Sequence, residues 1–328
     1  MLLLSEKEIH RVVSMNDMID AVKKAFIMMT EGTCEVPLRT VIDDKDGQST
    51  FLFMPAYAPG MDVASLKVIN IFPGNIDRGL SSAPAQILLI NGETGYIDAL
   101  IDGTCVTQLR TGGSTGAAFS VLAKENCRKG ALIGTGGQAP AQLEAMLCVR
   151  ELEQISVFDI DQRRCRAFAA EMTEKLARYG VPIIAAESSD ECIEDADLII
   201  TVTPSAGPVF DGSKVRAGAT ICAIGTYEPH KHEIDTETVR RASKIICDWK
   251  DAVLSESGDL MIPIAEGIIT ESDVQCSLGE VLLGRSPGRE TDEEIILYET
   301  VGVAMQDLAA AKVIYDKSLD CGAGTRWE

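Results

Sequence analysis

The first part of the chain, SEKEIHRVVSMNDMIDAVKKAFIMMTEG, places its apolar residues at helical spacing. Ser5 and Glu8 have the spacing of a capping box, in which the two side chains satisfy backbone N–H groups at a helix start. Ser14 or Asn16 can begin a second helix and Gly32 can end it, because short polar residues favour helix starts and glycine favours helix ends. The pattern therefore predicts two helices at the beginning of the chain.

After Pro37 the apolar residues fall into short runs rich in β-branched side chains and separated by NG, PG and TG turns. Three such runs are STFLFMPAY, DVASLKVINIF and AQILLINGETGYIDALI. Pro73, Gly74 and Gly79 mark a long loop inside the stretch INIFPGNIDRGLSS. This pattern predicts a mostly antiparallel sheet.

From about residue 112 onwards, strands and helices alternate. The small-residue stretch GGSTGAAFSVLAKENC predicts a helix, and the apolar runs that follow it predict strands: ALIGTG, ISVFDI, PIIAA, LIITVT, TICAIG and KIICDW. Alternation of this kind indicates right-handed βαβ units and a parallel sheet covered on both faces. A later stretch, EEIILYETVGVAMQDLAAAKVIYDKSLD, predicts a further helix that packs back on the N-terminal sheet.

The predicted fold class is therefore α/β, with a Rossmann-type doubly wound parallel sheet and an additional α+β domain. We place the Rossmann domain at residues 112–307. The α+β domain combines residues 1–111 with the C-terminal helix at residues 308–328.

The composition of the 328 residues, 46% hydrophobic and 24% charged, is typical of a globular protein of about two domains. A net charge of −20 argues against nucleic acid as a partner, because phosphate binding needs a basic surface. No unbroken apolar stretch reaches the roughly 18 residues of a membrane span. The N-terminus also lacks the basic start and long apolar centre of a signal peptide, so we expect no membrane partner.

The ten cysteines are scattered and form no C-x-x-C pair, which is typical of buried thiols in a reducing cytoplasm. We therefore expect a cytoplasmic protein. His230 and His232 have no cysteine or third histidine near them in the sequence, so we expect no metal site.

The most specific motif lies in ALIGTGGQAPAQLEAMLCVRELEQISVFDID, where Gly134-x-Gly136-x-x-Ala139 follows a predicted strand and opens a predicted helix. Gly134 permits a tight turn, Gly136 lets the backbone approach a pyrophosphate at the helix start, and Ala139 lets the helix lie close to the sheet. The next strand ends on Asp159, which can accept hydrogen bonds from the ribose hydroxyls of a dinucleotide. The motif predicts a nicotinamide dinucleotide site.

Asp159 also bears on the choice of cofactor. A 2′-phosphate beside this carboxylate would bring like charges together, and the next residue, Ile160, supplies no cation. Arg163 and Arg164 lie near enough in the sequence to leave NADP open. We expect NAD(H) to be preferred over NADP(H).

Three cations outside the Rossmann domain stand in unusual settings. Arg39 in VPLRTVI and Lys67 in ASLKVINI lie inside predicted apolar strands, and Arg110 in VTQLRTGG lies at the entry to the small-residue helix. A cation in an apolar strand is costly to bury without a partner, so an outward-facing position is the simpler explanation for any one of them. Arginine suits carboxylate recognition and lysine can move a proton, so the three together indicate an NAD-linked enzyme for a small acid.

The sequence resembles the ornithine cyclodeaminase/μ-crystallin family over nearly its whole length. The matching stretches, in order, are VPLRT, FMPAY, LKVINIFPGN, GLSS, TQLRTGG, IGTGGQA, AIGTYEPHKHEID and TVGVAMQDLAAAKVIY. The resemblance implies a dinucleotide-binding domain and a substrate-binding domain through which the protein forms a homodimer. Members of this family include ornithine cyclodeaminases, alanine dehydrogenases and reductases of cyclic imines.

The resemblance also implies site residues. Arg39, Lys67 and Arg110 match positions that hold the carboxylate and nitrogen of the substrate, and Val301 matches another substrate position. The positions that match residues around the dinucleotide are Ser82, Arg110, Thr111, Gly134, Gly136, Gly137, Gln138, Asp159, Thr203, Ile224, Gly225, Thr226, Lys231 and Thr300.

Two departures from the cyclodeaminase pattern stand out. Cyclodeaminases carry an aspartate in the loop where this chain has Tyr227, and a glutamate before the Met-Pro motif where it has Leu52. Both missing carboxylates are ones that an ornithine-type mechanism would use on the second nitrogen of the diamine. A tyrosine in this loop resembles instead the branch of imine reductases that act on Δ1-pyrroline-2-carboxylate.

We therefore predict an NAD(P)H-dependent reductase of a small cyclic imino acid. Arg39 and Arg110 are expected to hold the carboxylate, and Lys67 to hydrogen-bond the nitrogen or relay a proton. Tyr227 is either a hydrogen-bond donor to substrate or water, or a wall of the pocket. The alternatives are an ornithine cyclodeaminase, an alanine-type amino-acid dehydrogenase and a non-catalytic, crystallin-like binding protein.

Overall fold

The computed structural model describes all residues from 1 to 328, which divide into two compact units. Unit 1 consists of residues 1–110 and 303–328, and unit 2 of residues 111–302. The second boundary therefore falls at 302/303, five residues before the 307/308 boundary predicted from the sequence. Residues 303–307 belong to unit 1 because Gln306 and Asp307 pair there with Arg110 and Lys67.

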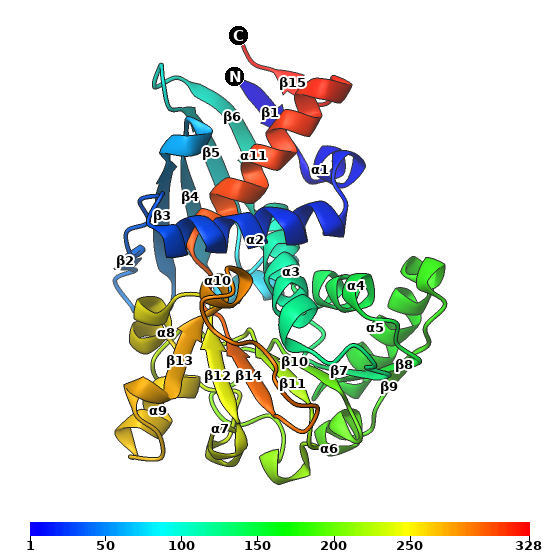
Figure 1. Ribbon diagram of the computed structural model, residues 1–328. Helices are drawn as coiled ribbons and strands as arrows, with labels where there is room; N and C mark the ends of the chain where they lie inside the picture. The colour runs from blue at the N-terminus through cyan, green and yellow to red at the C-terminus, as the bar shows by residue number, and fades with distance from the viewer. The chain divides into compact units, whose positions relative to one another are not determined.

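Unit 1 contains a seven-stranded sheet in the order β15-β1-β6-β5-β4-β3-β2 (Figure 1). Its strands are β1 (Leu2–Leu4), β2 (Thr40–Asp43), β3 (Thr50–Ala58), β4 (Val63–Ile71), β5 (Ala85–Asn91), β6 (Ile97–Asp102) and β15 (Thr325–Arg326). Its helices are α1 (Glu6–Val12), α2 (Met15–Glu31) and α11 (Ala304–Cys321), and α3 (Gly103–Leu122) begins here and ends in unit 2. Strands β2 to β6 pair antiparallel, as predicted, and β1 adds to β6 in parallel.

The predicted boundaries of the two N-terminal helices are confirmed. The backbone N–H of Ser5 donates to Glu8 Oε2 at 2.8 Å, and the Ser14 hydroxyl accepts the N–H of Asp17. Gly32 ends α2 in the left-handed region, with a φ of 66°. Glycine is favoured there because it has no Cβ atom to clash with the backbone.

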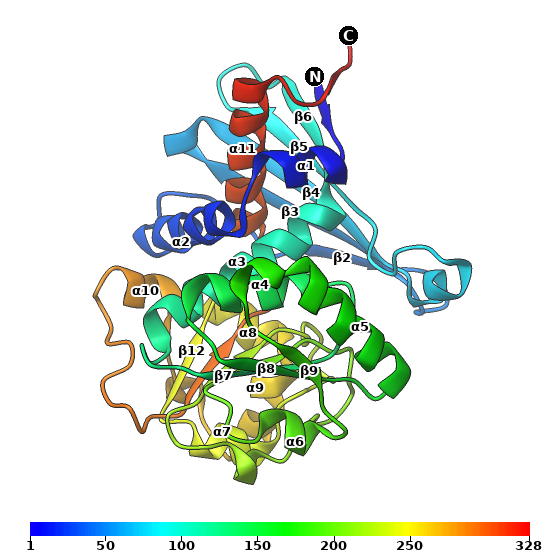
Figure 2. The same ribbon diagram turned by 90° about the vertical axis from the view of Figure 1, so that its right-hand side faces the viewer.

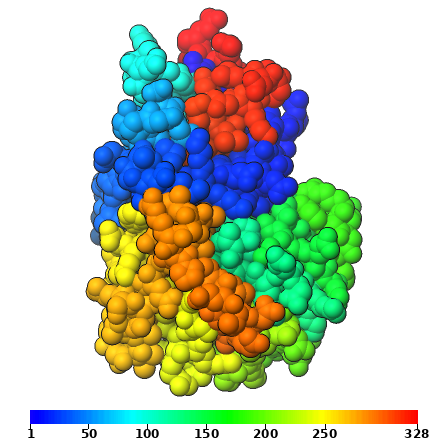
Figure 3. Space-filling model, in the orientation of Figure 1, coloured from blue at the N-terminus to red at the C-terminus, as the bar shows by residue number.

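Helices α2 and α11 pack against each other and lie on the same side of the sheet (Figure 2). The core between them and the sheet is apolar, with Phe26 on α2, Ile87 on β5 and Ile314 on α11 all buried. Figure 3 shows residues from the two ends of the chain, in blue and red, side by side on the surface of this unit. Unit 1 is therefore completed only when the last residues of the chain are in place.

Unit 2 contains an eight-stranded, wholly parallel sheet in the order β13-β12-β14-β11-β10-β7-β8-β9. Its strands are β7 (Lys129–Ile133), β8 (Gln154–Phe158), β9 (Ile183–Ala185), β10 (Leu198–Thr201), β11 (Thr220–Ala223), β12 (Lys244–Cys247), β13 (Val274–Ser277) and β14 (Ile296–Glu299). Its helices are α4 (Ala139–Val149), α5 (Gln162–Lys175), α6 (Ser189–Ile193), α7 (Thr236–Arg241), α8 (Lys250–Glu256), α9 (Gly258–Ala265) and α10 (Leu278–Leu282). Helices α4 and α5 lie on one side of the sheet and α6 and α7 on the other (Figure 2). The predicted α/β fold class is confirmed.

The sheet changes direction between β7 and β10. From β7 the chain adds β8 and then β9 on one side, and afterwards returns to place β10 and β11 on the other side. In open α/β sheets ligands bind beyond the carboxyl ends of the strands at such a switch point. The loop after β7 carries the glycine motif, so the topology puts that motif at the expected position.

One strand of this sheet was wrongly predicted as helix. The segment ILYE was included in a long C-terminal helix, whereas Ile296–Glu299 forms β14 between β11 and β12, and the helix begins only at Ala304. All four residues of β14 are buried, and a short run buried on both faces shows neither helical nor strand periodicity. Gly302, with a φ of 76°, separates the strand from the helix. Strand β13 was not predicted.

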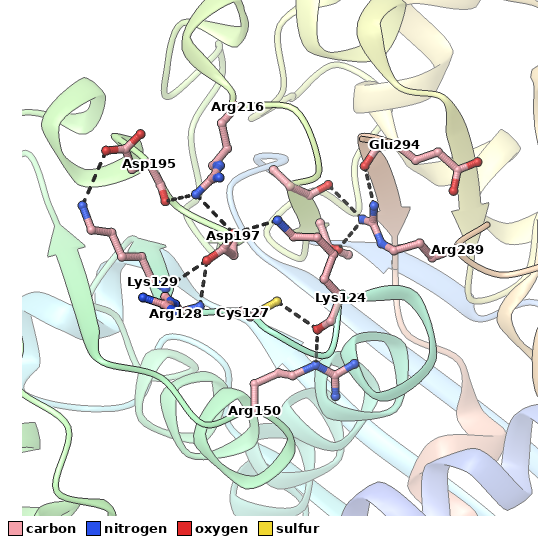
Figure 4. A network of polar contacts seen from close by, with 12 residues as sticks. Lys124, Cys127, Arg128, Lys129, Arg150, Asp195, Asp197, Arg216, Arg289 and Glu294 are labelled. Carbon is pink, nitrogen blue, oxygen red and sulfur yellow. Dashed lines mark hydrogen bonds and ion pairs between the residues drawn. The ribbon is translucent and has the colours of Figure 1, made fainter. Parts of the chain in front are cut away.

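A polar network closes the opposite edge of this sheet, at the amino ends of β7 and β10 (Figure 4). The carboxylate of Asp197 accepts the backbone N–H groups of Arg128 and Lys129 and pairs with Lys124 at 3.0 Å. Burial alone would raise the pKa of Asp197, but these donors outweigh it and lower the pKa.

Two arginines finish the carboxyl end of α3 in the same network. Arg289 donates to the carbonyl of Leu122 at 2.8 Å, and Arg150 donates to the carbonyls of Ala123 and Lys124. Cations are favourable there because the last carbonyls of a helix have no intrahelical donor.

No helix of the protein is both long enough and apolar enough to cross a membrane.

Candidate active site

The three cations predicted from the sequence all lie in unit 1, and two of them share one carboxylate. Lys67 Nζ lies 2.6 Å from Asp307 Oδ2, and Arg110 Nε lies 3.0 Å from Asp307 Oδ1. Arg110 Nη1 also donates to Gln306 Oε1 at 2.9 Å. Lys67 is 1% exposed, so it does not face outward from its strand. A buried ammonium needs such a partner, because desolvation of an isolated charge costs several kcal/mol.

The environment of Lys67 favours loss of its proton. Burial is the main cause, and the positive charges of Arg110 and Arg39 add to it, whereas Asp307 opposes it. Together they lower the pKa of Lys67 to about 7. A lysine with this pKa can exchange a proton near neutral pH, which is the property needed of a general acid or base.

Arg39 is placed differently from the prediction. It lies in the extended segment just before β2 and not inside a strand, and it is half-buried. Its charge is close enough to act on Lys67.

Ser82 lies in the loop before β5, where its carbonyl accepts the N–H of Phe72. Leu52, at the position of the missing glutamate, is buried in the core of the sheet.

In unit 2 the glycine motif forms a tight turn between β7 and α4. Gly134 has a φ of 101°, and a Cβ there would lie 2.6 Å from the carbonyl oxygen of Val202. At Gly136, by contrast, a Cβ would meet nothing within 4 Å, and both Gly136 and Gly137 are exposed. No side chain caps the start of α4, and the buried Oε1 of Gln138 has no protein partner. The N–H of Ala139 donates to the carbonyl of Gly136 at 3.1 Å and Pro140 has no N–H, so an anion such as a pyrophosphate would be met mainly by the loop before α4.

Asp159 stands at the end of β8 but is already engaged by the protein. Its Oδ2 accepts the backbone N–H and hydroxyl of Thr135 at 3.0 and 2.7 Å, and its Oδ1 accepts the N–H of Asp161. Arg164 Nη2 lies 2.7 Å from both oxygens. Burial works to raise the pKa of Asp159, but Arg164 and these N–H donors outweigh it and lower the pKa.

Two of the predicted cofactor residues, Thr203 and Gly225, are held together by a carboxyl group that sequence reasoning missed. Glu233 is fully buried, and its two oxygens accept the N–H of Thr203 at 2.6 Å and the N–H of Gly225 at 2.7 Å. Burial and then the nearby Asp259 raise the pKa of Glu233 to about 8. Gly225 must be glycine, since a Cβ would lie 2.2 Å from the carbonyl oxygen of Thr203. Glu233 therefore sets the spacing of the loops after β10 and β11.

A second buried carboxylate positions the segment after β14. Asp248 Oδ2 accepts the hydroxyl of Thr300 at 2.6 Å and the N–H of Gly302 at 2.8 Å. Val301, the predicted substrate residue between them, is 8% exposed. The residues of this segment are thus held by a side chain at the end of β12. Asp248, like Glu233, carries no motif of its own, although its place directly after an apolar strand was an available signal.

The remaining predicted residues lie at the same edge of unit 2 or in the helix that leads to it. Ile224 and Gly225 follow β11, Thr226 is buried, and Tyr227 is half-buried. Lys231 pairs with Glu228 of the same loop. Thr111, on α3, is also buried. His230 is exposed, and no group of three or more His, Cys, Asp or Glu side chains is arranged to hold a metal ion.

The chain is similar to known proteins over its whole length. The model of the ornithine cyclodeaminase/mu-crystallin family matches residues 1–322. The chain belongs to this family. It is 34% identical over 328 residues, all of both chains, to a protein of Bacillus cereus named Delta(1)-pyrroline-2-carboxylate reductase. The predicted family is therefore confirmed.

Two solved structures are similar over the full length of the chain. The structure of Thermococcus litoralis Delta(1)-pyrroline-2-carboxylate reductase in complex with NADH and L-proline is 38% identical, with a TM-score of 0.96 and coverage of 100% of both chains. An archaeal alanine dehydrogenase dimer with bound NAD is 32% identical, with a TM-score of 0.91 and coverage of 100% of this chain and 98% of the other. These similarities confirm the predicted enzyme class, since both relatives are NAD-linked enzymes of imine or amino-acid chemistry.

The open space at Gly136 leads to a prediction about nucleotide binding. In Gly136→Ala the new methyl group meets no protein atom, so the unfolding temperature of the free protein should not change. The methyl group should instead occupy the space where the pyrophosphate approaches the backbone, and the affinity for NADH should fall about tenfold or more. Both are measured on one preparation, by thermal unfolding and by NADH fluorescence titration.

Gly60→Ala is the matched control, because a Cβ at Gly60 in unit 1 also meets nothing within 4 Å. It should change neither quantity. Unchanged NADH affinity in Gly136→Ala would contradict the assignment of this loop as the pyrophosphate site.

Proposed function

We propose that this family member is an NAD(P)H-dependent reductase of a small cyclic imino acid, which converts Δ1-pyrroline-2-carboxylate or its six-membered homologue into the corresponding L-amino acid. The observation that carries the proposal is the buried cluster of Lys67, Arg110 and Asp307 in unit 1. The full-length similarity to Delta(1)-pyrroline-2-carboxylate reductases, one of them in complex with NADH and L-proline, supports it.

Three cations of unit 1, namely Lys67, Arg110 and Arg39, bind different parts of the substrate. Arg110 and Arg39 bind the carboxylate, for which the planar guanidinium with its several donors is well suited. Lys67 holds a proton at Nζ for the imine nitrogen. Fixing the substrate at both its carboxylate and its nitrogen presents one carbon, the one between them, for reduction.

NADH supplies the hydride when it is bound by unit 2. Gly134, Gly136 and Gln138 form the pyrophosphate loop, and Thr203, Gly225 and Thr300 lie on the loops that Glu233 and Asp248 hold in place. Tyr227 contributes a hydroxyl to the loop after β11, as a donor to substrate or to water.

The same residues bear on the alternative functions. An ornithine cyclodeaminase would need carboxylates for the second nitrogen of its substrate, but position 52 is a buried leucine and position 227 is a tyrosine. The similarity to an archaeal alanine dehydrogenase makes amination of a small oxo acid the second candidate. A non-catalytic binding protein would have no need of a lysine whose pKa is lowered to about 7.

The test is a panel that follows nicotinamide absorbance with Δ1-pyrroline-2-carboxylate, its piperideine homologue, pyruvate plus ammonia, and ornithine. We expect turnover with a cyclic imine and a loss of about 10²-fold or more in kcat for Lys67→Met, which removes the proton donor. Lys7→Met, at an exposed position of α1, is the matched control and should retain full activity. Release of ammonia from ornithine, or turnover confined to pyruvate plus ammonia, would contradict the proposal.

For the cofactor, we propose that NAD(H) is preferred and that Arg164 limits the preference. The carboxylate of Asp159 disfavours a 2′-phosphate, but the guanidinium of Arg164 at 2.7 Å compensates its charge. Arg164 also uses the carboxylate oxygens that the ribose hydroxyls would need, so it works against NADH and in favour of NADPH.

Arg164→Gln should therefore increase the ratio of kcat/KM for NADH to that for NADPH about tenfold. Arg163→Gln is the control, since Arg163 is an exposed neighbour on the same helix with no side-chain contact to Asp159. An equal change in both variants would mean that only the general surface charge matters, and no change in Arg164→Gln would refute its role.

We also propose a homodimer formed through unit 1. Strand β2 is an edge strand whose four residues are all exposed, and it carries Val41 and Ile42 next to the exposed Leu38. An exposed apolar edge strand is a liability for a monomer and is usually covered. A second copy is the chosen occupant because a relative of similar fold is a dimer with bound NAD.

Light scattering should give about twice the chain mass of 35.2 kDa. Ile42→Asp should shift the protein towards the monomer, because it places a charge on the apolar edge. Ile184→Asp, on the exposed edge strand β9 of unit 2, should leave the mass unchanged. A monomeric wild-type protein, or equal dissociation in both variants, would contradict this interface.

A further inference from the structure

Asp307 is the one carboxylate in contact with the proposed catalytic lysine. It lies near the start of α11, its side chain is 1% exposed, and its two oxygens serve two different cations. Oδ2 lies 2.6 Å from Lys67 Nζ on β4, and Oδ1 accepts Arg110 Nε from α3 at 3.0 Å. Sequence reasoning gave Asp307 no role, because a single aspartate in a helical stretch is usually exposed.

The charges around Lys67 depend on this residue. Lys67 is influenced by Asp307 on α11, by Arg110 on α3 and by Arg39 on the segment before β2. Burial and both arginines favour the neutral amine, and Asp307 alone favours the ammonium. Asp307 is therefore the carboxylate that opposes burial and the two arginines at Lys67.

Asp307 also fixes the orientation of Arg110. With Nε bound to Asp307 and Nη1 bound to Gln306, the plane of the guanidinium is set by two residues of the same helix. Gln306 is itself held in place, because its Oε1 accepts the N–H of Val303 at 3.0 Å. We expect Nη2 to be the nitrogen that donates to a substrate carboxylate.

We propose that Asp307 is a positioning residue of the imine reduction, which keeps Lys67 protonated and holds Arg110 in the orientation that binds the substrate carboxylate. This inference rests on the function proposed above. In the reduction, hydride adds to the ring carbon, the π electron pair of the C=N bond moves to nitrogen, and the Lys67 ammonium gives that nitrogen its proton. Lys67 is left as a neutral amine beside the Asp307 carboxylate and regains a proton from water.

The test compares Asp307→Asn with the wild type across pH. In the wild type, kcat/KM for Δ1-pyrroline-2-carboxylate should fall as pH rises through about 7, because the protonated lysine is the active form. Loss of the negative charge should move this fall to lower pH by one unit or more. The variant should therefore be at least tenfold more impaired at pH 8 than at pH 6, relative to wild type. KM should also rise, since Arg110 loses one of its two supports.

A merely structural role is separated by two further variants. Asp307→Glu keeps the charge and should restore the wild-type pH midpoint even where kcat is reduced. Asp316→Asn, on the exposed part of the same helix and paired only with Lys312, should leave the pH profile unchanged. An Asp307→Asn protein with lower stability but an unchanged midpoint would overturn the inference, as would an Asp307→Glu protein whose midpoint has moved.

A readout without turnover distinguishes this inference from the proposed function. The protein is labelled with ¹³C at Cε of lysine, and the Lys67 signal is assigned by its absence in Lys67→Met. Its titration gives the pKa of Lys67 directly, which should be lower in Asp307→Asn than in Asp307→Glu or the wild type. If the wild type reduces no imine but this difference is seen, only the proposed function fails. If imine is reduced and the Lys67 titration is the same in all three proteins, only the inference about Asp307 fails.

Discussion

The buried contact of Asp307 with Lys67 and Arg110 is the constraint on which unit 1 depends. The side chains of Lys67 and Asp307 are each 1% exposed, and an unpaired charge at such a position would cost several kcal/mol. The contact joins β4, the first part of α3 and the start of α11, although Arg110 and Asp307 are 197 residues apart in the sequence. Unit 1 therefore takes its last helix from the far end of the chain, and its cationic cluster cannot form without that helix.

In unit 2, buried carboxyl groups hold loops in position. Its functional loops present backbone N–H groups and small residues, which cannot fix one another's positions. Glu233 and Asp248 fix the positions of these loops, and each accepts two donors from loops at the carboxyl edge of the sheet. Buried carboxyl groups are costly unless their oxygens are satisfied, so each acts as a rigid spacer only while its donors are in place.

The charge of the whole protein and the charge of its site have opposite signs. The chain carries a net charge of −20, yet Lys67 and Arg110 share the carboxylate of Asp307, and the charge of Arg39 also acts on Lys67. A small anion is therefore attracted to this cluster, although the overall negative charge of the protein repels it. With leucine at position 52 and tyrosine at position 227, no further carboxylate is supplied for a second substrate nitrogen. This charge pattern fits an acid with a single nitrogen next to its carboxylate.

The sequence alone determined the elements that follow local rules. The capping residues Ser5 and Ser14, the left-handed Gly32, the glycine motif after β7 and the alternating strands and helices all depend on neighbours within a few residues. Strand β14 was not predicted, because the residues of a short run buried on both faces show no hydrophobic periodicity. Only its pairing with β11 and β12 identifies it. Likewise, only the tertiary structure decided that Asp307 meets Lys67, that Glu233 holds Thr203 and Gly225, and that Arg164 covers Asp159. Asp307 lies far along the sequence from the cations it meets, and although Arg164 is only five residues from Asp159, the local sequence does not show which way its side chain turns. The pairing of buried charges is fixed only when the chain is packed.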